Sequence, residues 1–382
     1  MRICLVYDCL YPNTVGGAER WYRALAERLA EAGHDVTYLT LRQWPRDSDA
    51  EVPGVAVVSA GPQMELYAGG RRRILPPLAF GLGVLAHLLR HGRSYDAVHT
   101  SSFPYFSLLA AAAARRVGGY RLFVDWLEVW TGEYWREYLG RVGGTVGWTI
   151  QRRCVRVRQR AFCLSRLHAR RLREEGLRGE PTVLEGAYNG SLTADDPLPA
   201  EHVVVFAGRQ IPEKRAAAIV PAVAKARERL PDLHAEIFGD GPEHEEILRL
   251  AAELGLDGEV EAPGFVDGER IEAAMRTALC NVLPSVREGY GLVVVEAASK
   301  GTPSVVVSAP DNAATELVEE GENGTVAPSS RPEDLAAAIV RVAEAGHALR
   351  VSTVEWFRRN ARRLSVDSSL ETVLRVYAED DR

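Results

Sequence analysis

The feature that most restricts the fold of this chain is a repeated order of apolar strand, glycine-containing loop and helix. The first series has an apolar strand at 2–7, a loop that reaches Gly17 and a helical pattern at 18–32. A second strand at 35–41 follows, so the segment predicts a βαβ unit, which requires a parallel sheet. Another series starts with the strand at 202–207. We therefore predict an α/β protein with two domains, and 382 residues suffice for two cores.

The composition is that of an ordinary globular protein, with 46% apolar and 26% charged residues. Its five cysteines form no C-x-x-C pair, so we expect reduced thiols and neither a disulfide framework nor a zinc site. The first residues, M-R-I-C-L-V-Y-D, are typical of a buried strand, because the apolar run is short and ends at Asp8. We therefore expect a cytoplasmic protein without a signal peptide.

Charge is distributed unevenly along the chain. Residues 1–180 contain 26 arginines and 17 acidic residues, a net charge of +9, although the whole chain has a net charge of -6. This asymmetry indicates two domains with different partners. The arginine-rich segment 151–173 predicts a solvated basic surface. We do not expect nucleic-acid binding, because the aromatic residues lie elsewhere and the chain is acidic overall.

An apolar segment at 74–89 is flanked by Arg71-Arg72-Arg73 and Arg90. Pro76-Pro77 interrupts it, and it is shorter than a membrane span needs, so we do not expect a transmembrane helix. A core helix is the main interpretation. The alternative is a basic, partly membrane-facing surface, which would give the protein peripheral membrane contact through its basic N-terminal domain.

The segment S-V-R-E-G-Y-G-L-V-V-V-E carries the clearest chemical signal. Glu288 and Glu296 are separated by seven residues, and Gly289 and Gly291 between them permit a sharp turn. Leu292 starts a helical pattern, so backbone N–H groups and the positive helix end face the loop that carries Glu288. A diphosphate bound there would have a carboxylate on each side, which is the layout of a nucleotide sugar. The alternative is a glycine-rich loop that caps an ordinary helix.

A dinucleotide-binding domain is the main rival for the first βαβ unit. The chain has no G-x-G-x-x-G after that strand, and the second strand ends in T-L-R-Q-W. It therefore lacks the acidic residue that would bind an adenosine ribose, and NAD is not expected as a cofactor.

Three motifs resemble those of the retaining glycosyltransferases of family four. E-G-Y-G-L-V-V-V-E-A-A-S-K-G-T-P, from Glu288 to Pro303, resembles the E-x7-E signature of that family. G-R-Q-I-P-E-K, from Gly208 to Lys214, resembles its phosphate clamp, and Gly16-Gly17-Ala18-Glu19 resembles its G-G-x-E loop. The resemblance extends over nearly the whole chain.

The resemblance implies the GT-B architecture, in which two Rossmann-like domains, each with a parallel sheet, face an interdomain cleft. The N-terminal, acceptor-side domain is expected at 1–190, with a C-terminal helix at about 362–382 packing back on it. The domain that binds the nucleotide sugar is expected at 191–361.

The resemblance also implies residue roles. Arg209 and Lys214 would stabilise charge on the departing diphosphate, and Glu288 would orient the donor sugar. The turn E-A-P-G-F-V resembles the family's base-binding turn. The residues expected to bind the donor are Gly16, Gly17, Phe265, Val266, Gly289, Tyr290, Gly291, Leu292 and Glu296, with Glu296 on the ribose.

No metal and no cofactor are implied beyond the nucleotide sugar itself. Asp47-Ser48-Asp49 resembles the D-x-D metal motif of the other large glycosyltransferase fold. It lies in a polar loop after Pro45 and not at a strand end, so we interpret it as a solvated loop.

The segment D-W-L-E-V-W-T-G-E-Y-W-R-E-Y predicts an acceptor site. Aromatic faces beside carboxylates suit a hydroxylated or cyclic acceptor, although simple packing is the alternative. Relatives often have histidine where this chain has Leu127. Whether a histidine takes part in acceptor binding in this chain is therefore left open. The loop Pro310 to Glu316 replaces the family's G-G-x-x-E and lacks glycine. The residues assigned to acceptor binding are His99, Trp126, Glu128 and Trp130.

We therefore predict a retaining, metal-independent hexosyl- or pentosyltransferase. It would move a sugar from a nucleotide-diphosphate sugar to a hydroxylated natural product, lipid or glycan. The alternatives are a GT-B-type nucleotide-sugar epimerase and a catalytically weak nucleotide-sugar-binding protein. The base, the sugar, the acceptor and the oligomeric state are left open.

Overall fold

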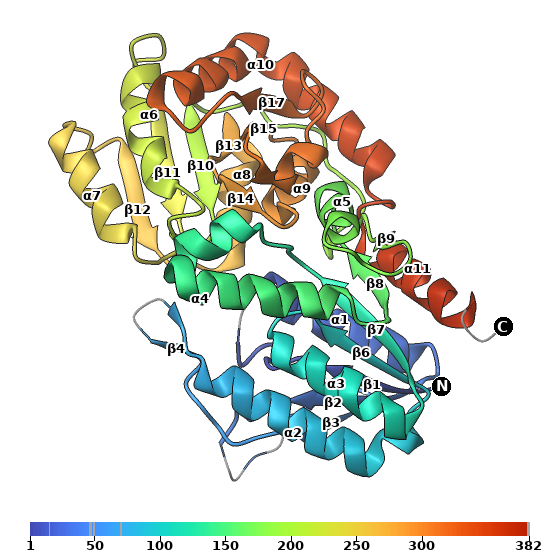
Figure 1. Cartoon of the computed structure of the whole chain (residues 1–382). Helices are drawn as coiled ribbons and strands as arrows, with labels where there is room; N and C mark the ends of the chain where they lie inside the picture. Colours follow the sequence, from blue (N-terminus) through green and yellow to red (C-terminus); the bar gives the residue numbers. More distant parts are fainter. Residues whose placement is uncertain (15, 46–47, 49, 69–70, 380–382) are drawn as a thin grey trace. The chain divides into compact units, whose positions relative to one another are not determined.

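The computed structural model describes residues 1–14, 16–45, 48, 50–68 and 71–379 (Figure 1). These residues form two compact units. The first unit comprises Met1–Leu184 and Leu370–Arg382, and the second comprises Glu185–Ser369.

The first unit is built on a parallel sheet. Among its described residues the sheet has seven strands in the order β3-β2-β1-β6-β7-β8-β9, and all six pairings are parallel. The βαβ unit predicted at the N-terminus is therefore confirmed. The strands are β1 (Arg2–Val6), β2 (Asp35–Thr40), β3 (Val55–Ser59), β6 (Ala97–Ser101), β7 (Arg121–Trp126), β8 (Arg160–Cys163) and β9 (Thr182–Val183), with a separate antiparallel pair of β4 (Tyr67–Ala68) and β5 (Arg71–Arg72). The helices are α1 (Gly17–Glu31), α2 (Leu75–His91), α3 (Tyr105–Gly118), α4 (Gly132–Val155), α5 (Arg166–Glu174) and most of α11 (Val366–Glu379).

The second unit repeats this plan. Its main sheet has six strands among the described residues, in the order β12-β11-β10-β13-β15-β17, again all parallel. The strands are β10 (Val203–Ala207), β11 (His234–Phe238), β12 (Val260–Gly264), β13 (Cys280–Leu283), β15 (Ser304–Val307) and β17 (Gly324–Ala327), with a short parallel pair of β14 (Arg287–Glu288) and β16 (Asp311–Asn312). The helices are α6 (Ile219–Ala226), α7 (His244–Glu253), α8 (Gly268–Thr277), α9 (Leu292–Ser299) and α10 (Pro332–Asn360).

Strands near the centre of each sheet are buried. All five residues of β6 and all four of β13 are buried. Parallel strands covered on both faces have no solvent-exposed side, so these two strands do not alternate between buried and exposed residues. The five cysteines, all within the described residues, are buried and free.

The boundary between the units lies at Leu184, whereas the sequence placed it at residue 190. Tyr188 explains the difference, because its N–H donates to the Leu364 carbonyl and its carbonyl accepts from Val366. Ser369 also donates its hydroxyl to the Gly186 carbonyl at 2.6 Å. These bonds tie the segment after Leu184 to the chain before α11, so both belong to the second unit.

The connection from β10 to β11 contains a 3-10 turn at Ala216–Ala218 and then α6, which ends at Ala226. Pro221 has no N–H and fits only the first turn of a helix, which places the start of α6 at Ile219. Within the described residues, no helix combines the length and the apolar character that crossing a membrane requires.

Candidate functional site: an ion pair beside a helix N-terminus

An ion pair lies where β10 and β13 end in the second unit. The loop after β10 carries Lys214, and the segment after β13 carries Glu288. Because β10 and β13 are neighbouring parallel strands, their carboxyl ends lie side by side, which is where open α/β sheets bind ligands. The Lys214 ammonium contacts Oε1 of Glu288, and the two side chains are 21% and 7% exposed. The structure therefore brings together two of the three residues to which catalysis was assigned.

Neighbouring polar groups fix the Glu288 carboxylate. The Ser285 hydroxyl donates to Glu288 Oε1 at 2.8 Å. The Ser285 carbonyl in turn accepts from Nδ2 of Asn312, which also donates to the Val307 carbonyl at 2.7 Å. Sequence reasoning missed Ser285 and Asn312. Asn312 stands in the loop that departs from the family's usual sequence, and here that loop supports the glutamate.

The turn before α9 requires glycine at position 291. Gly291 has φ 97°, and a Cβ there would lie 2.5 Å from the Cβ of Ala314. Gly289 precedes it in the same turn, and α9 then begins at Leu292, so its unpaired N–H groups and positive dipole end lie beside the segment that carries Glu288.

Tyr290 holds this turn in place. Its phenol donates to the Glu185 carbonyl at 2.7 Å, and burial raises the pKa of Tyr290, so the phenol keeps its proton. The buried Tyr290 side chain, to which donor binding was assigned, thus anchors the turn to the segment at Glu185. Glu296 is half-buried and lies about one turn inside α9.

The loop that carries Lys214 is built around Gln210, which sequence reasoning did not single out. Gln210 is fully buried and donates to the Gly239 carbonyl at 2.7 Å. Gly239 has φ 110°, and a Cβ there would lie 2.0 Å from the Gly208 carbonyl, so the two loops touch through their backbones. Arg209, next to Gln210, is exposed.

Phe265 and Val266 follow the end of β12. Phe265 is among the most exposed large apolar residues, whereas Val266 packs against the core cluster that contains Val205 and Phe238. An exposed ring beside a parallel-sheet edge can stack on a planar group, which is consistent with the predicted base contact.

The predicted G-G-x-E loop lies at the start of α1 in the first unit. Gly16 is the N-cap of α1 and Gly17 is its first residue. A Cβ on Gly16 would lie 2.3 Å from Oε2 of Glu19, whose other oxygen accepts from the Tyr7 hydroxyl at 3.3 Å. Asp47 and Asp49 of the D-x-D segment lie outside the described residues.

Two residues assigned to acceptor binding are core residues. Trp126 is fully buried, and its indole N–H donates to Oε1 of Gln159 at 2.8 Å. His99 is also fully buried, with Nε2 2.9 Å from Oδ1 of Asp125 and Nδ1 2.7 Å from the Tyr377 hydroxyl. For these two residues the packing alternative is correct, because neither presents an open surface to an acceptor.

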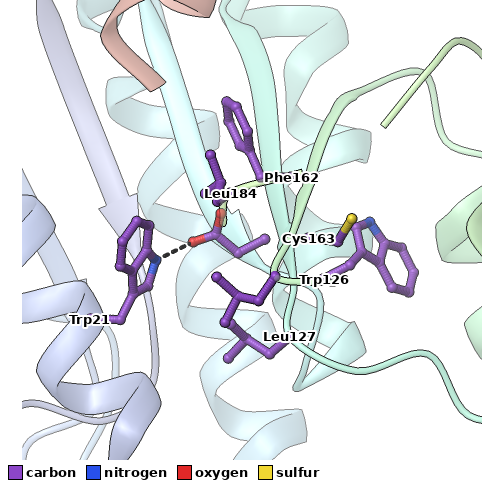
Figure 2. Close-up of a pocket in the computed structure, with 8 residues that line it drawn as sticks. Trp21, Trp126, Leu127, Phe162, Cys163 and Leu184 are labelled. Carbon is purple, nitrogen blue, oxygen red and sulfur yellow. Dashed lines mark hydrogen bonds between the residues drawn. The ribbon is translucent and has the colours of Figure 1, made fainter. Parts of the chain in front are cut away.

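The environment of Asp125 shows why this cluster is structural (Figure 2). Burial raises the pKa of Tyr377 well above its ordinary value, so the phenol keeps its proton and can hydrogen-bond with Nδ1 of His99. Nε2 of His99 bonds to one oxygen of Asp125, whose second oxygen accepts from the Trp21 indole at 2.8 Å, the dashed line in Figure 2. Both carboxylate oxygens are bonded, which a buried charge requires.

Trp130 and Glu128 remain available as acceptor residues. The Trp130 indole donates to Oε2 of Glu128 at 2.7 Å, and both side chains are half-buried. The ring also packs against Tyr134 and Tyr138, with centroids 4.8 and 5.4 Å away. Buried Gln151 fixes the backbone of Trp130 through both its N–H and its carbonyl, and sequence reasoning missed it.

This fold and this site define a class of protein. Residues 16–185 match the family model described as "Glycosyl transferase 4-like domain", and residues 196–363 match the one described as "Glycosyl transferases group 1". Together with the two parallel sheets, these matches show that the chain belongs to the family-four type of GT-B glycosyltransferases.

Individual relatives agree with this classification. A D-inositol 3-phosphate glycosyltransferase of a Nocardioides species is 33% identical over 190 residues, 46% of this chain and 41% of that relative. The match thus covers less than half of the length of that relative. A phosphatidyl-myo-inositol mannosyltransferase of Mycolicibacterium smegmatis is 28% identical, over 92% of this chain and 88% of that protein. The solved structure of Anabaena HepE in complex with UDP has the same fold, with a TM-score of 0.73, 18% identity, and coverage of 99% of this chain and 100% of that one.

Proposed function

We propose that the chain is a retaining, metal-independent glycosyltransferase. It takes a sugar from a nucleotide-diphosphate sugar and gives it to a hydroxylated acceptor, which is a natural product, a lipid or a glycan. The observation that carries this proposal is the partly buried Lys214–Glu288 ion pair beside the start of α9. The cation and the helix N-terminus can bind a diphosphate, and the carboxylate can bind the sugar attached to it.

Each charged group has a task in the proposed reaction. The bond between the sugar's anomeric carbon and the diphosphate oxygen breaks, and Arg209, Lys214 and the start of α9 stabilise the departing charge. The acceptor hydroxyl forms a new bond to the same face of the sugar. Its proton goes to an oxygen of the leaving diphosphate, while Glu288 orients the sugar.

Donor binding must change the partner of Lys214. In the structure Lys214 is held by Glu288, and a bound diphosphate would need the same ammonium. We infer an exchange, in which the diphosphate takes Lys214 and the freed Glu288 carboxylate accepts hydrogen bonds from the sugar hydroxyls. Ser285 keeps the carboxylate in place during the exchange, because its hydrogen bond does not involve Lys214.

The names of relatives support the donor and acceptor classes without fixing either. HepE was solved with UDP, and the two relatives are named for inositol phosphate and phosphatidyl-myo-inositol. A thermal-shift screen with UDP-, GDP- and dTDP-sugars tests the proposal, since a ligand at 100 times its Kd adds about 2.7 kcal/mol of stability. One nucleotide series should raise the melting temperature, and no shift with any of them would count against a donor site.

Two further functions are separated by the products. A GT-B-type epimerase would convert the nucleotide sugar into its epimer without any acceptor, and a weak binding protein would consume no donor. Dependence of donor consumption on an added acceptor would identify the protein as a transferase.

We also propose that the enzyme is cytoplasmic, because its five cysteines are buried free thiols. We further propose that its basic N-terminal half permits contact with a membrane surface.

Removal of divalent metal should leave the transfer rate unchanged. The positive field that a metal supplies in other enzymes comes here from Arg209, Lys214 and the start of α9. Initial rates with and without a chelator provide the measurement. Strict dependence on manganese or magnesium would refute this mechanism and would favour a metal site at Asp47 and Asp49.

Trp130→Ala should raise KM for the acceptor about tenfold and leave KM for the donor unchanged. Stacking on one aromatic ring contributes about 0.5 to 1.5 kcal/mol, and about 1.4 kcal/mol corresponds to a tenfold change. Steady-state kinetics with each substrate varied in turn gives both constants. Tyr138→Ala, which removes an exposed neighbour of the same ring, is the matched comparison. Equal changes in both KM values would show that Trp130 does not act on the acceptor.

A further inference from the structure

Helix α4 is folded back on itself. Gly140, with φ 73°, divides it into two helical halves. The halves approach closely, because a Cβ on Gly144 in the second half would lie 2.2 Å from the Trp135 carbonyl oxygen in the first. This close approach explains how Gln151, near the end of α4, reaches Trp130, which precedes the helix by two residues.

The Gln151 side chain is the centre of a hydrogen-bond network. It is fully buried, and its Oε1 accepts from the Trp130 N–H at 3.0 Å and from the Trp135 indole at 3.1 Å. The same oxygen accepts from the Tyr105 hydroxyl at 2.9 Å. Nε2 donates to the Trp130 carbonyl at 2.7 Å. An apolar side chain at this position would leave three donors and one acceptor without this partner, which is costly in a buried place.

These bonds converge on the aromatic surface assigned to the acceptor. Gln151 fixes Trp130 through its backbone on both sides of the residue. It also fixes the indole of Trp135, whose ring lies against that of Trp130 with the centroids 4.7 Å apart. Gln151 itself is fully buried, so it acts on an acceptor only through the residues that it holds.

We propose that Gln151 is a positioning residue for acceptor binding, which keeps the Trp130 ring in the orientation that stacks on the acceptor. A binding group that is not held by its supporting residues loses much of its effect through small displacements. This inference rests on the proposed function, and specifically on the acceptor role of Trp130. The alternative, that Gln151 only stabilises the fold, is an outcome of the test.

Fluorine-19 NMR of protein labelled with fluorotryptophan tests the positioning without any acceptor. The chain contains seven tryptophans, and single tryptophan to phenylalanine variants assign their signals. Gln151→Met should displace or broaden the signals of Trp130 and Trp135. It should leave the signal of Trp356, in the second unit, unchanged.

Gln159→Met is the matched control. Gln159 is also buried in the first unit, but its Oε1 accepts from the core residue Trp126. This variant should displace the Trp126 signal and leave that of Trp130 in place. Both methionine variants should lower the melting temperature, so stability alone does not separate them and the spectra do.

Gln151→Glu serves if Gln151→Met does not fold. It keeps an oxygen for the three accepted bonds, and burial raises the pKa of such a carboxyl. Once ionised, the carboxylate cannot donate to the Trp130 carbonyl. Raising the pH should therefore displace the Trp130 signal in this variant and not in the wild type.

Kinetics with p-nitrophenyl glucoside as the acceptor probe complete the test. Gln151→Met should raise KM for the acceptor about fivefold, somewhat less than removal of the Trp130 ring, and leave KM for the donor unchanged. In the Trp130→Ala background it should add nothing, because the ring that it positions is absent. Gln159→Met should leave both KM values unchanged.

An unchanged Trp130 signal in both Gln151 variants overturns the proposal. An effect of Gln151→Met on acceptor KM that persists in full in the Trp130→Ala background also overturns it and assigns Gln151 to the fold alone. The absence of donor binding by the wild type would instead contradict the proposed function. The fluorine spectra do not depend on donor or acceptor, so the two failures are distinguishable.

Discussion

Glu288→Gln should lower kcat for sugar transfer by about 100-fold or more, while it tightens the binding of the nucleoside diphosphate product about threefold. The amide cannot replace the carboxylate on the sugar hydroxyls in the transition state. It also releases Lys214, which the free enzyme holds against Glu288. Because Lys214 must leave Glu288 before it can bind the diphosphate, the ion pair reduces the apparent affinity for the nucleoside diphosphate. A variant in which Lys214 is already free should therefore bind this product more tightly. Single-turnover kinetics and calorimetry with the nucleoside diphosphate give the two quantities.

Glu296→Gln is the matched control for this prediction. Glu296 is the second carboxylate of the same motif, and its assigned partner is the ribose. Its variant should weaken nucleotide binding and should change kcat less than Glu288→Gln does. Turnover near the wild-type rate in Glu288→Gln would show that the site is misplaced. Weaker nucleotide binding in that variant would contradict the proposed exchange at Lys214.

Trp126→Ala should destabilise the protein by about 3 kcal/mol or more, since Phe and Trp to Ala changes in cores cost about 3 to 5 kcal/mol. The change leaves a cavity and removes the donor to Gln159. For a unit of this size the loss corresponds to a fall in Tm of about 10 °C. Differential scanning calorimetry of the wild type and the variant measures it.

Trp130→Ala provides the comparison, because that ring is only half-buried and should cost less stability. We thus expect Trp126→Ala to lower the stability and Trp130→Ala to raise KM for the acceptor. A Trp126→Ala variant with unchanged Tm and a raised acceptor KM would restore Trp126 to the acceptor site.

The elements with strong local patterns could be predicted from the sequence. β1, α1 and β2 follow from apolar runs, a glycine loop and a helical period, and these are properties of neighbouring residues. The contact between Lys214 and Glu288, which are 74 residues apart, follows from the rule that carboxyl ends of neighbouring parallel strands meet.

The burial of Trp126 and His99 could not be predicted in this way. Both faces of a parallel sheet are covered, so the apolar run of β7 does not reveal whether a side chain at its end is open to a ligand. One of the two partners of His99 is Tyr377, 278 residues away, and no local signal links these two residues. The support of Glu288 by Asn312 depends on β14 and β16, which are two residues each and too short to give a periodic pattern.

The most direct test of the central claim is proton NMR of the transfer product in the presence of a chelator, with the donor found by thermal shift. We expect the transferred sugar to keep the anomeric configuration that it had in the donor. We also expect Lys214→Ala to yield almost no product under the same conditions. An inverted anomeric centre, or product formation by Lys214→Ala at the wild-type rate, would contradict this claim.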